Sequence, residues 1–145
     1  MKHKMLISIL LALVMLVTLA TPALAGKPFK AYMFKGTETQ GTVQCGLQTT
    51  HDNYIKLTFV AKGVTGNRTY HVWVYDNTNP YYDWHYAGYF QADENGKARA
   101  RVKTSGSFAD GYHILTIRLT DSTTEPTYTS SDYFWATTAH DVLFK

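Results

Sequence analysis

The sequence has little cysteine. Cys45 is the only one among 145 residues, so the chain cannot form an internal disulfide. Cys45 shares one face of a predicted strand with Val43 and Leu47, which indicates a small buried side chain. The fold must therefore be held together by apolar burial and backbone pairing.

The sequence also lacks the motifs of common enzymes. It has no Gly-x-Ser-x-Gly elbow, no glycine-rich phosphate loop before a helix and no His-Glu-x-x-His. Carboxylates that could pair for glycoside cleavage stand mostly in predicted turns, where acidic residues are ordinary. These are Asp83, Asp93, Glu94, Asp121 and Glu125. We therefore expect no enzyme and assign no catalytic residue.

Closely spaced metal ligands are absent as well. Five histidines follow residue 25, at positions 51, 71, 85, 113 and 140, and none forms a His-x-His or His-x3-His pair. The oxygen-rich loop 76–79, taken with Asp83, does not match the calcium-loop pattern. His71 and His113 lie on strands that could be neighbours, but hydrogen-bonded histidines are the simpler interpretation. No metal and no cofactor are predicted.

A long hydrophobic run occurs only near the N-terminus. A basic start, residues 1–4, precedes the apolar stretch 5–20, and Ala23-Leu24-Ala25 supplies the small residues of a cleavage site. This order predicts a signal peptide over residues 1–25, cleaved after Ala25, and one secreted domain over residues 26–145, extracellular or periplasmic. An uncleaved anchor is the alternative, but the run is short for a bilayer span. No membrane span is predicted after cleavage.

Little net charge remains without the leader. The chain carries 14 Lys and Arg against 11 Asp and Glu, a formal charge of +3, and subtracting Lys2 and Lys4 leaves +1. This near balance gives no indication of a nucleic-acid partner.

What the sequence does contain is strand alternation, clearest over residues 53–75. The first strand there places alternate apolar residues on one face, the pattern of a half-buried strand. Its inward set is Ile55, Leu57, Phe59 and Ala61. After turn residues at 62–67, the strand 68–75 has apolar or aromatic residues on both faces, which predicts a central position. We take this pair of strands as the core of a β-sandwich.

The rest of the chain adds further short strands separated by turn signals. They are expected over residues 29–35, 42–48, 84–92, 97–103, 112–119, 127–136 and 142–144. Their number and spacing predict an all-β fold, a single antiparallel β-sandwich of about 7–9 short strands. A buried Trp73 on a central strand is compatible with an immunoglobulin-like arrangement, although the Cys–Trp–Cys spacing is missing. The pattern over residues 57–119 resembles secreted bacterial immunoglobulin-like modules.

Aromatic residues crowd one stretch and form the first candidate site. Their flat faces and polar tips suit sugar rings or protein partners, and strict alternation cannot bury all of them. The predicted aromatic edge comprises Tyr81, Tyr82, Trp84, Tyr86 and Tyr89. The alternative is that these rings simply pack across an edge of the sandwich.

Cations alternate along one strand and form the second candidate, an anion-binding face. The predicted ladder comprises Lys97, Arg99, Arg101 and Lys103. Side chains two positions apart repel one another unless an anion or an acidic neighbour offsets them. Such a face fits an anionic polymer of a cell envelope, a phosphate chain or an acidic glycan. The alternative is a solvated face that guards against edge-to-edge aggregation.

The turn 93–96 is a strong hairpin signal and bears on both candidates. A hairpin there would set Ala92 opposite Lys97 and Phe90 opposite Arg99, with Phe90 on the cationic face. A bulge or a longer loop would reverse that face. The register therefore decides whether the aromatic and basic groups form one site.

These observations favour a secreted, non-catalytic binding module for a cell-envelope polysaccharide or a surface protein. The alternative is a self-associating structural subunit that uses open strand edges at residues 29–35 and 142–144. A small glycan-cleaving enzyme or a metal carrier is the third possibility.

Overall fold

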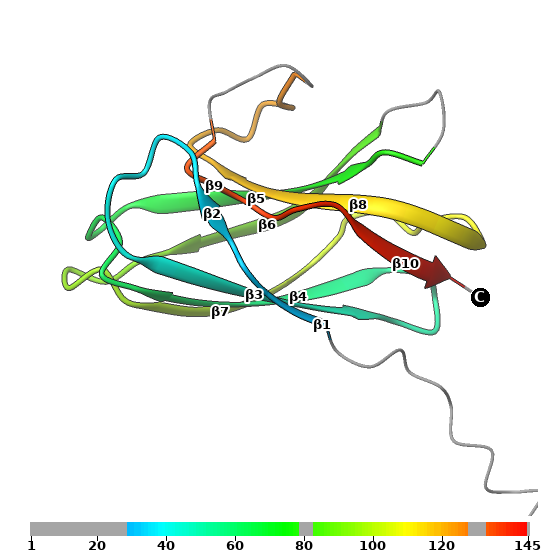
Figure 1. Cartoon of the computed structure of the whole chain (residues 1–145), viewed down its shortest axis with the longest axis horizontal. Helices are drawn as coiled ribbons and strands as arrows, with labels where there is room; N and C mark the ends of the chain where they lie inside the picture. The colour runs from blue at the N-terminus through cyan, green and yellow to red at the C-terminus, as the bar shows by residue number, and fades with distance from the viewer. Residues whose placement is uncertain (1–28, 79–82, 128–132, 145) are drawn as a thin grey trace, which may run out of the picture.

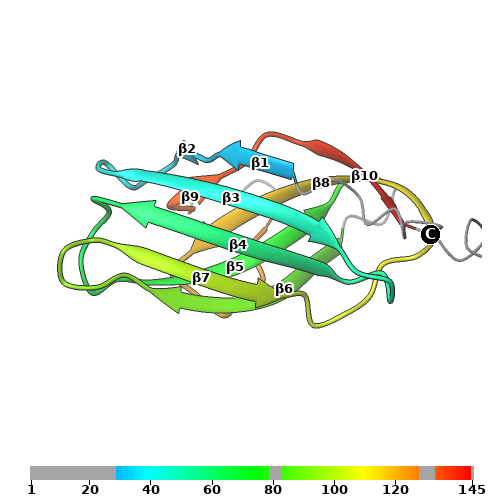
Figure 2. The same ribbon diagram turned by 90° about the horizontal axis from the view of Figure 1, so that it is seen from below.

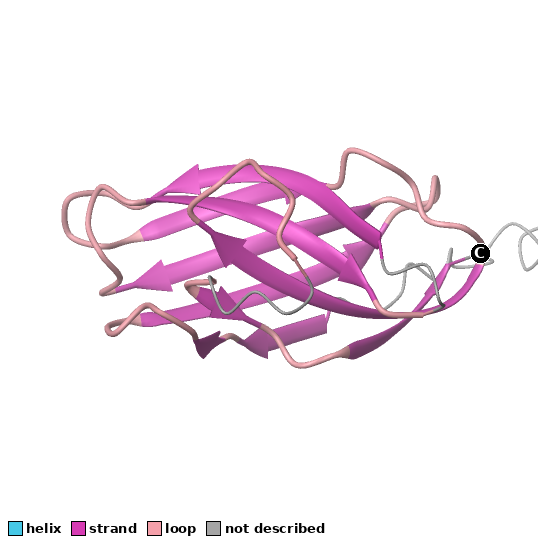
Figure 3. Cartoon of the chain, turned by 90° about the horizontal axis from the view of Figure 1, so that it is seen from above, coloured by secondary structure: helices cyan, strands magenta, loops and turns pink. Residues whose placement is uncertain are grey.

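The computed structural model describes residues 29–78, 83–127 and 133–144. This part of the chain consists of strands and loops (Figure 3), and it contains no helix long and apolar enough to cross a membrane. The predicted signal peptide and two residues of the predicted aromatic edge, Tyr81 and Tyr82, lie outside the described residues.

Two antiparallel sheets pack face to face (Figure 1). Sheet A has the order β1 (Phe29–Tyr32), β3 (Thr42–Thr49), β4 (Ile55–Lys62) and β7 (Ala98–Lys103). Sheet B has the order β2 (Phe34–Lys35), β9 (Trp135–Ala136), β8 (Gly111–Thr120), β5 (Thr69–Asp76) and β6 (Asp83–Gln91), with β10 (His140–Phe144) also paired to β8. The predicted all-β sandwich is confirmed.

The described residues form ten strand segments, slightly more than the 7–9 expected. Two of them, β2 and β9, are only two residues long. Among the described residues of the strand predicted over residues 127–136, Trp135 and Ala136 form β9, and residues 128–132 lie outside the described part. The extra segments have two causes. The predicted strand 29–35 divides into β1, which pairs with β3 in sheet A, and β2, which pairs with β9 in sheet B. Near the C-terminus, β9 and β10 pair with different parts of β8.

The period-two pattern places the apolar residues between the sheets as expected. In β4 the inward residues Ile55, Leu57 and Phe59 have no exposed surface. In β8 the inward residues Leu115, Ile117 and Leu119 are at most 1% exposed. Phe90 stacks between Phe59 of sheet A and Tyr70 of sheet B, with both pairs of ring centroids 5.2 Å apart. Aromatic pairs of this kind contribute about 0.5–1.5 kcal/mol beyond their burial.

The strands joined by the turn 93–96 do not form the predicted hairpin. β6 pairs with β5 in sheet B, whereas β7 pairs with β4 in sheet A. The turn itself forms, since the Asp93 N–H donates to the Lys97 carbonyl at 2.9 Å, but the chain then crosses to the other sheet. Phe90 enters the core instead of facing Arg99. The condition under which the aromatic and basic groups would share a sheet is therefore not met, and the two groups lie on different sheets.

A β-bulge in β6 changes which aromatic residues face outward. Trp73 pairs with Tyr86 but Val72 pairs with Gly88, so Ala87 is the extra residue. Gly88 has a φ of 115°, a left-handed value that glycine adopts easily. The bulge turns Tyr86 to the outer face and Phe90 to the core. Strict alternation along this strand predicts one face for Trp84, Tyr86 and Phe90. Trp84 and Tyr86 do share the outer face, and Phe90 departs from the prediction by entering the core.

A buried carboxylate ties two loops together at one end of the sandwich. Glu38, 3% exposed, accepts hydrogen bonds from Thr65 Oγ1 at 2.8 Å, Arg68 Nη1 at 3.0 Å and Tyr70 OH at 3.0 Å. Burial by itself raises the pKa of Glu38. The hydrogen bonds from Thr65 and Tyr70 and the charge of Arg68 outweigh burial, so the pKa lies below its usual value. The carboxylate is thus the stable form in the folded protein.

Replacing Glu38 by glutamine should lower the free energy of unfolding by about 1–3 kcal/mol, because Arg68 loses its charged partner. Urea unfolding at neutral pH measures this loss.

The stability that Glu38 contributes should also depend on pH. Because its pKa is held below the ordinary 4.5, this stabilisation is complete at neutral pH and is lost as the pH falls below 4.5. Wild-type stability should then fall more steeply with acid than that of Glu38→Gln. Glu125→Gln, at an exposed loop position, is the control. Equal acid dependence in wild type and Glu38→Gln would contradict the assignment.

Candidate functional site

The aromatic candidate lies on the outer face of sheet B, where most of its described rings are packed together. Trp84 is only 9% exposed and contacts Tyr75 and Trp73, with ring centroids 4.6 Å and 6.5 Å away. Trp73 Nε1 donates to the Ser122 carbonyl at 3.2 Å. The loop after β8 thus borders this cluster. The cluster is a second small core and not an open platform.

Tyr86 and Tyr89 continue this face toward His71. The Tyr86 hydroxyl and His71 Nδ1 lie 3.0 Å apart, and burial raises the pKa of Tyr86. Tyr89 is 66% exposed, with its ring centroid 5.8 Å from that of His71. Of the three predicted edge residues that the structure describes, Tyr89 alone is largely open to solvent.

The basic candidate lies on β7, in the sheet that faces the viewer in Figure 2. The burial pattern of β7 places its cations on the outer face of sheet A. Arg99, Arg101 and Lys103 are exposed on β7, and Lys97 is exposed just before it. Their inward neighbours are partly buried residues that pack against the core. The predicted alternation of this strand, with its cations outward, is confirmed.

The structure adds cations from other strands to the same face. The pairing of β4 with β7 sets Lys56 opposite Lys103, Thr58 opposite Arg101 and Val60 opposite Arg99. The exposed cations within the strands of sheet A are Lys30, Lys56, Lys62, Arg99, Arg101 and Lys103. We call this surface the cationic face. The four strands contain no Asp or Glu.

The cationic face has no acidic partner among the described residues. None of its six strand cations takes part in the ion pairs there, and Lys103 Nζ instead lies 3.8 Å from the centroid of the Tyr54 ring. Sheet B differs, because its strands carry two cations, Lys35 and Arg118, and three aspartates. Charge is therefore segregated between the sheets.

Sequence reasoning missed part of this face. Alternation along residues 55–61 already placed Lys56 on the polar side of its strand, but it did not show which strand lies alongside. Lys30 is likewise far from the ladder in sequence and reaches the same sheet only through the pairing of β1 with β3. The signal that could have found them is the absence of acidic residues from all four segments.

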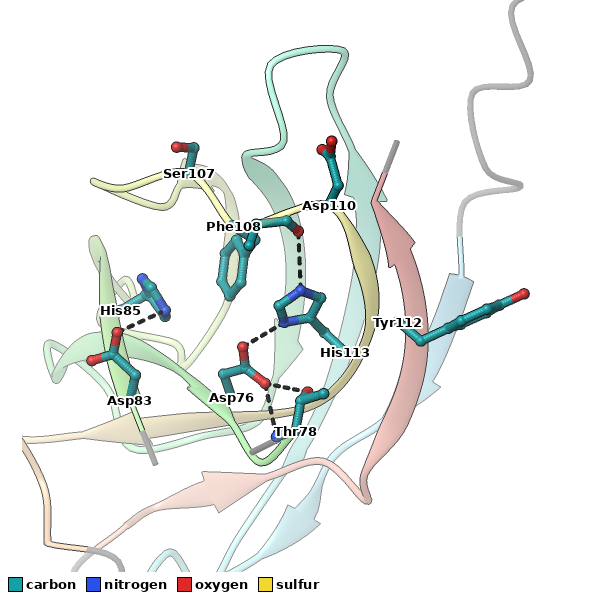
Figure 4. A pocket seen from close by; sticks show the side chains of 10 residues that line it. Asp76, Thr78, Asp83, His85, Ser107, Phe108, Asp110, Tyr112 and His113 are labelled. Atoms are coloured by element: carbon teal, nitrogen blue, oxygen red, sulfur yellow. Dashed lines mark hydrogen bonds and ion pairs between the residues drawn. The ribbon is translucent and has the colours of Figure 1, made fainter. Parts of the chain in front are cut away.

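A pocket of about 450 Å³ opens at one end of the sandwich, between the ends of β5 and β6 and the loop before β8 (Figure 4). His113 Nδ1 lies 2.5 Å from Asp76 Oδ2, and His113 Nε2 lies 3.0 Å from the Ala109 carbonyl. His85 Nε2 is 3.5 Å from Asp83 Oδ2, and the Phe108 ring packs against His85 with centroids 4.2 Å apart.

His113 is poorly placed to act as a general base in this pocket. Both nitrogens of His113 face hydrogen-bond acceptors, so neither is free to take a proton from Ser107, which also lines the pocket. Among the described residues no three His, Cys, Asp or Glu side chains group as metal ligands. His71 pairs with Thr120 at the far end of β5, so it does not meet His113. Burial raises the pKa of the Cys45 thiol to about 12, which makes it a poor nucleophile.

Comparisons of the chain with protein families, with curated proteins and with solved structures find no match in any of the three.

Trp84→Ala should destabilise the fold by about 3 kcal/mol, because it empties the centre of the outer aromatic cluster. Tyr89→Ala, on the same strand, should change stability by less than about 0.5 kcal/mol, since that ring is exposed. Urea unfolding of the two variants measures the difference. Equal stability of the two variants would show that Trp84 is not packed as described.

Proposed function

We propose that this chain is a non-catalytic binding module that holds an anionic cell-surface polymer on the cationic face. The observation that carries the proposal is the gathering of six exposed Lys and Arg on three of the four strands of sheet A, a sheet whose strands contain no acidic residue. A polymer with repeated negative charges meets several of these cations at once. An acidic protein surface would meet the same cations, but the regular strand spacing suits a repeating partner better.

The energetics favour many weak contacts over one strong one. An exposed charge pair contributes about 0.2–1 kcal/mol, so a single acidic group would be held only weakly. Contacts along one polymer add together, because the first contact raises the effective concentration of the next charge. Such binding weakens as salt rises. The aromatic cluster is not included in the site, since its rings are already packed with one another.

The proposal extends to the fold family and the compartment. The consecutive strands β4 and β5 lie in opposite sheets, and each has a later strand beside it, β7 next to β4 and β8 next to β5. In immunoglobulin domains the B and C strands lie beside E and F in this way, which supports an immunoglobulin-like order. Trp73 is a departure, because its ring lies on the outer face. The predicted signal peptide supports secretion, outside the cell or in the periplasm.

Arg101→Glu should weaken retention on immobilised polygalacturonate at low salt by about tenfold, which corresponds to about 1.4 kcal/mol. Lys35→Glu makes the same change of net charge on an exposed position of sheet B and is the matched control. The measurement is the salt concentration at which wild type and each variant, as the mature protein of residues 26–145, elute from the immobilised polygalacturonate. Equal loss in both variants would mean that net charge and not the cationic face is responsible, and unchanged retention of Arg101→Glu would refute the proposal.

Self-association is a second candidate function, favoured by exposed apolar residues beside a sheet edge. Leu143 of β10 pairs with Tyr112 of β8, and Ile114 lies on the same outer face. These side chains are 39%, 72% and 38% exposed. Adjacent exposed apolar groups at the end of a sheet can bury one another between copies.

If the chain self-associates there, sedimentation should show a mass that rises with concentration, and Leu143→Arg should return the protein to a monomer because it places a charge in the contact. Tyr89→Arg changes an exposed residue of β6 away from this edge and should leave the mass unchanged. A monomer at every concentration would remove this candidate.

A further inference from the structure

One row of residues crosses the cationic face at right angles to its strands. The pairing sets Lys30 opposite Gly46, Gly46 opposite Thr58 and Thr58 opposite Arg101. We call these four residues the Gly46 row. It has a cation on each edge strand and small residues on the two strands between them. With strands about 4.8 Å apart, its ends are separated by about 14 Å of sheet.

Gly46 is unusual for its position in the middle of β3. Its φ is not among the left-handed values found in the chain, so the backbone does not require glycine. A Cβ placed there would meet Phe29 O at 3.6 Å and Thr58 Cβ at 3.8 Å, which are ordinary contacts. Glycine weakens a strand interior and often marks a place where a ligand approaches the backbone closely. Because Gly46 has no side chain, nothing projects from the outer face of the sheet at this position.

The rows on either side of the Gly46 row carry different chemistry on its two halves. On β4 and β7 three of the four neighbours are cations, Lys56, Lys103 and Arg99, and the fourth is Val60. On β3 they are the exposed amides Gln44 and Gln48. Beside Gln44, on β1, stands Tyr32, which is 73% exposed. The face therefore offers mostly charges on β4 and β7, and amides, an open aromatic ring and one cation, Lys30, on β3 and β1.

We infer that the polymer is an acidic polysaccharide, and that a single chain of it crosses the strands along the Gly46 row. This inference rests on the proposed function and deepens it. Carboxylates on the sugars meet Arg101 and its neighbouring lysines, while hydroxyls meet the amides of Gln44 and Gln48. A sugar ring can lie against the Tyr32 ring. Polyphosphate or a nucleic acid would satisfy the charges of β4 and β7 but makes less use of the amides of Gln44 and Gln48.

The test fills the row without changing charge. Gly46→Phe and, independently, Thr58→Phe each place a bulky ring in the row from a different strand. Thr42→Phe adds the same ring to the same face of β3, four residues from Gly46, and is the matched control. We expect both row variants to bind soluble polygalacturonate at least tenfold more weakly, and the control to bind within twofold of wild type. Thermal unfolding should show all three variants folded, because an aromatic residue favours a strand.

The outcomes separate this inference from the function on which it rests. If Arg101→Glu abolishes binding and neither row variant does, the cationic face binds the polymer but the path along the Gly46 row is wrong. If Arg101→Glu also has no effect, the proposed function itself fails. In parallel, Tyr32→Ala should weaken binding to polygalacturonate and leave binding to inorganic polyphosphate unchanged. Tighter binding to polyphosphate or to a single-stranded oligonucleotide than to polygalacturonate would overturn the choice of an acidic polysaccharide.

Discussion

The pleat of β4 and β7 is the constraint on which the surface of this protein depends. Each strand must bury alternate residues against sheet B, and Phe59 in β4 does so by stacking on Phe90. Because successive side chains point to opposite faces, burying one set commits the other set to solvent. The cations of both strands therefore lie on one surface. A register slip of one residue would bring Arg101 into the core, so packing and the charge pattern enforce each other.

The two outer faces of the sandwich are used differently. On sheet B the bulge at Ala87 turns Tyr86 outward, next to Trp73, and the Trp73 ring is held by the loop after β8. That face is occupied by its own side chains. The outer face of sheet A has no such aromatic cluster among the described residues, and its strand cations lack acidic partners there. The outer face of sheet B is therefore covered by aromatic packing, whereas the outer face of sheet A is exposed and charged.

Local features of this fold could be predicted from the sequence, and its long-range pairings could not. The period-two pattern identified β3, β4, β5, β7 and β8 with their inward residues, because alternation is a property of each strand alone. The turn 93–96 formed as its residues indicated, but turn chemistry does not decide whether the strands pair or diverge into two sheets. The bulge at Ala87 and the burial of Glu38 depend on contacts far along the chain. The cationic ladder could be found within one strand, whereas Lys30 and Lys56 joined it only through strand pairing.

Protection against aggregation does not account for the whole cationic face. Lysine and arginine on an edge strand discourage pairing between molecules, and this explains the cations of β7, which is the last strand of sheet A. It does not explain Lys56, because β4 lies between β3 and β7 and has no free edge. A surface arranged only for solubility would intersperse both signs, since Lys56 directly opposite Lys103 repels it. The chain has 11 acidic residues and places none on these strands. The proposed anionic partner would offset that repulsion.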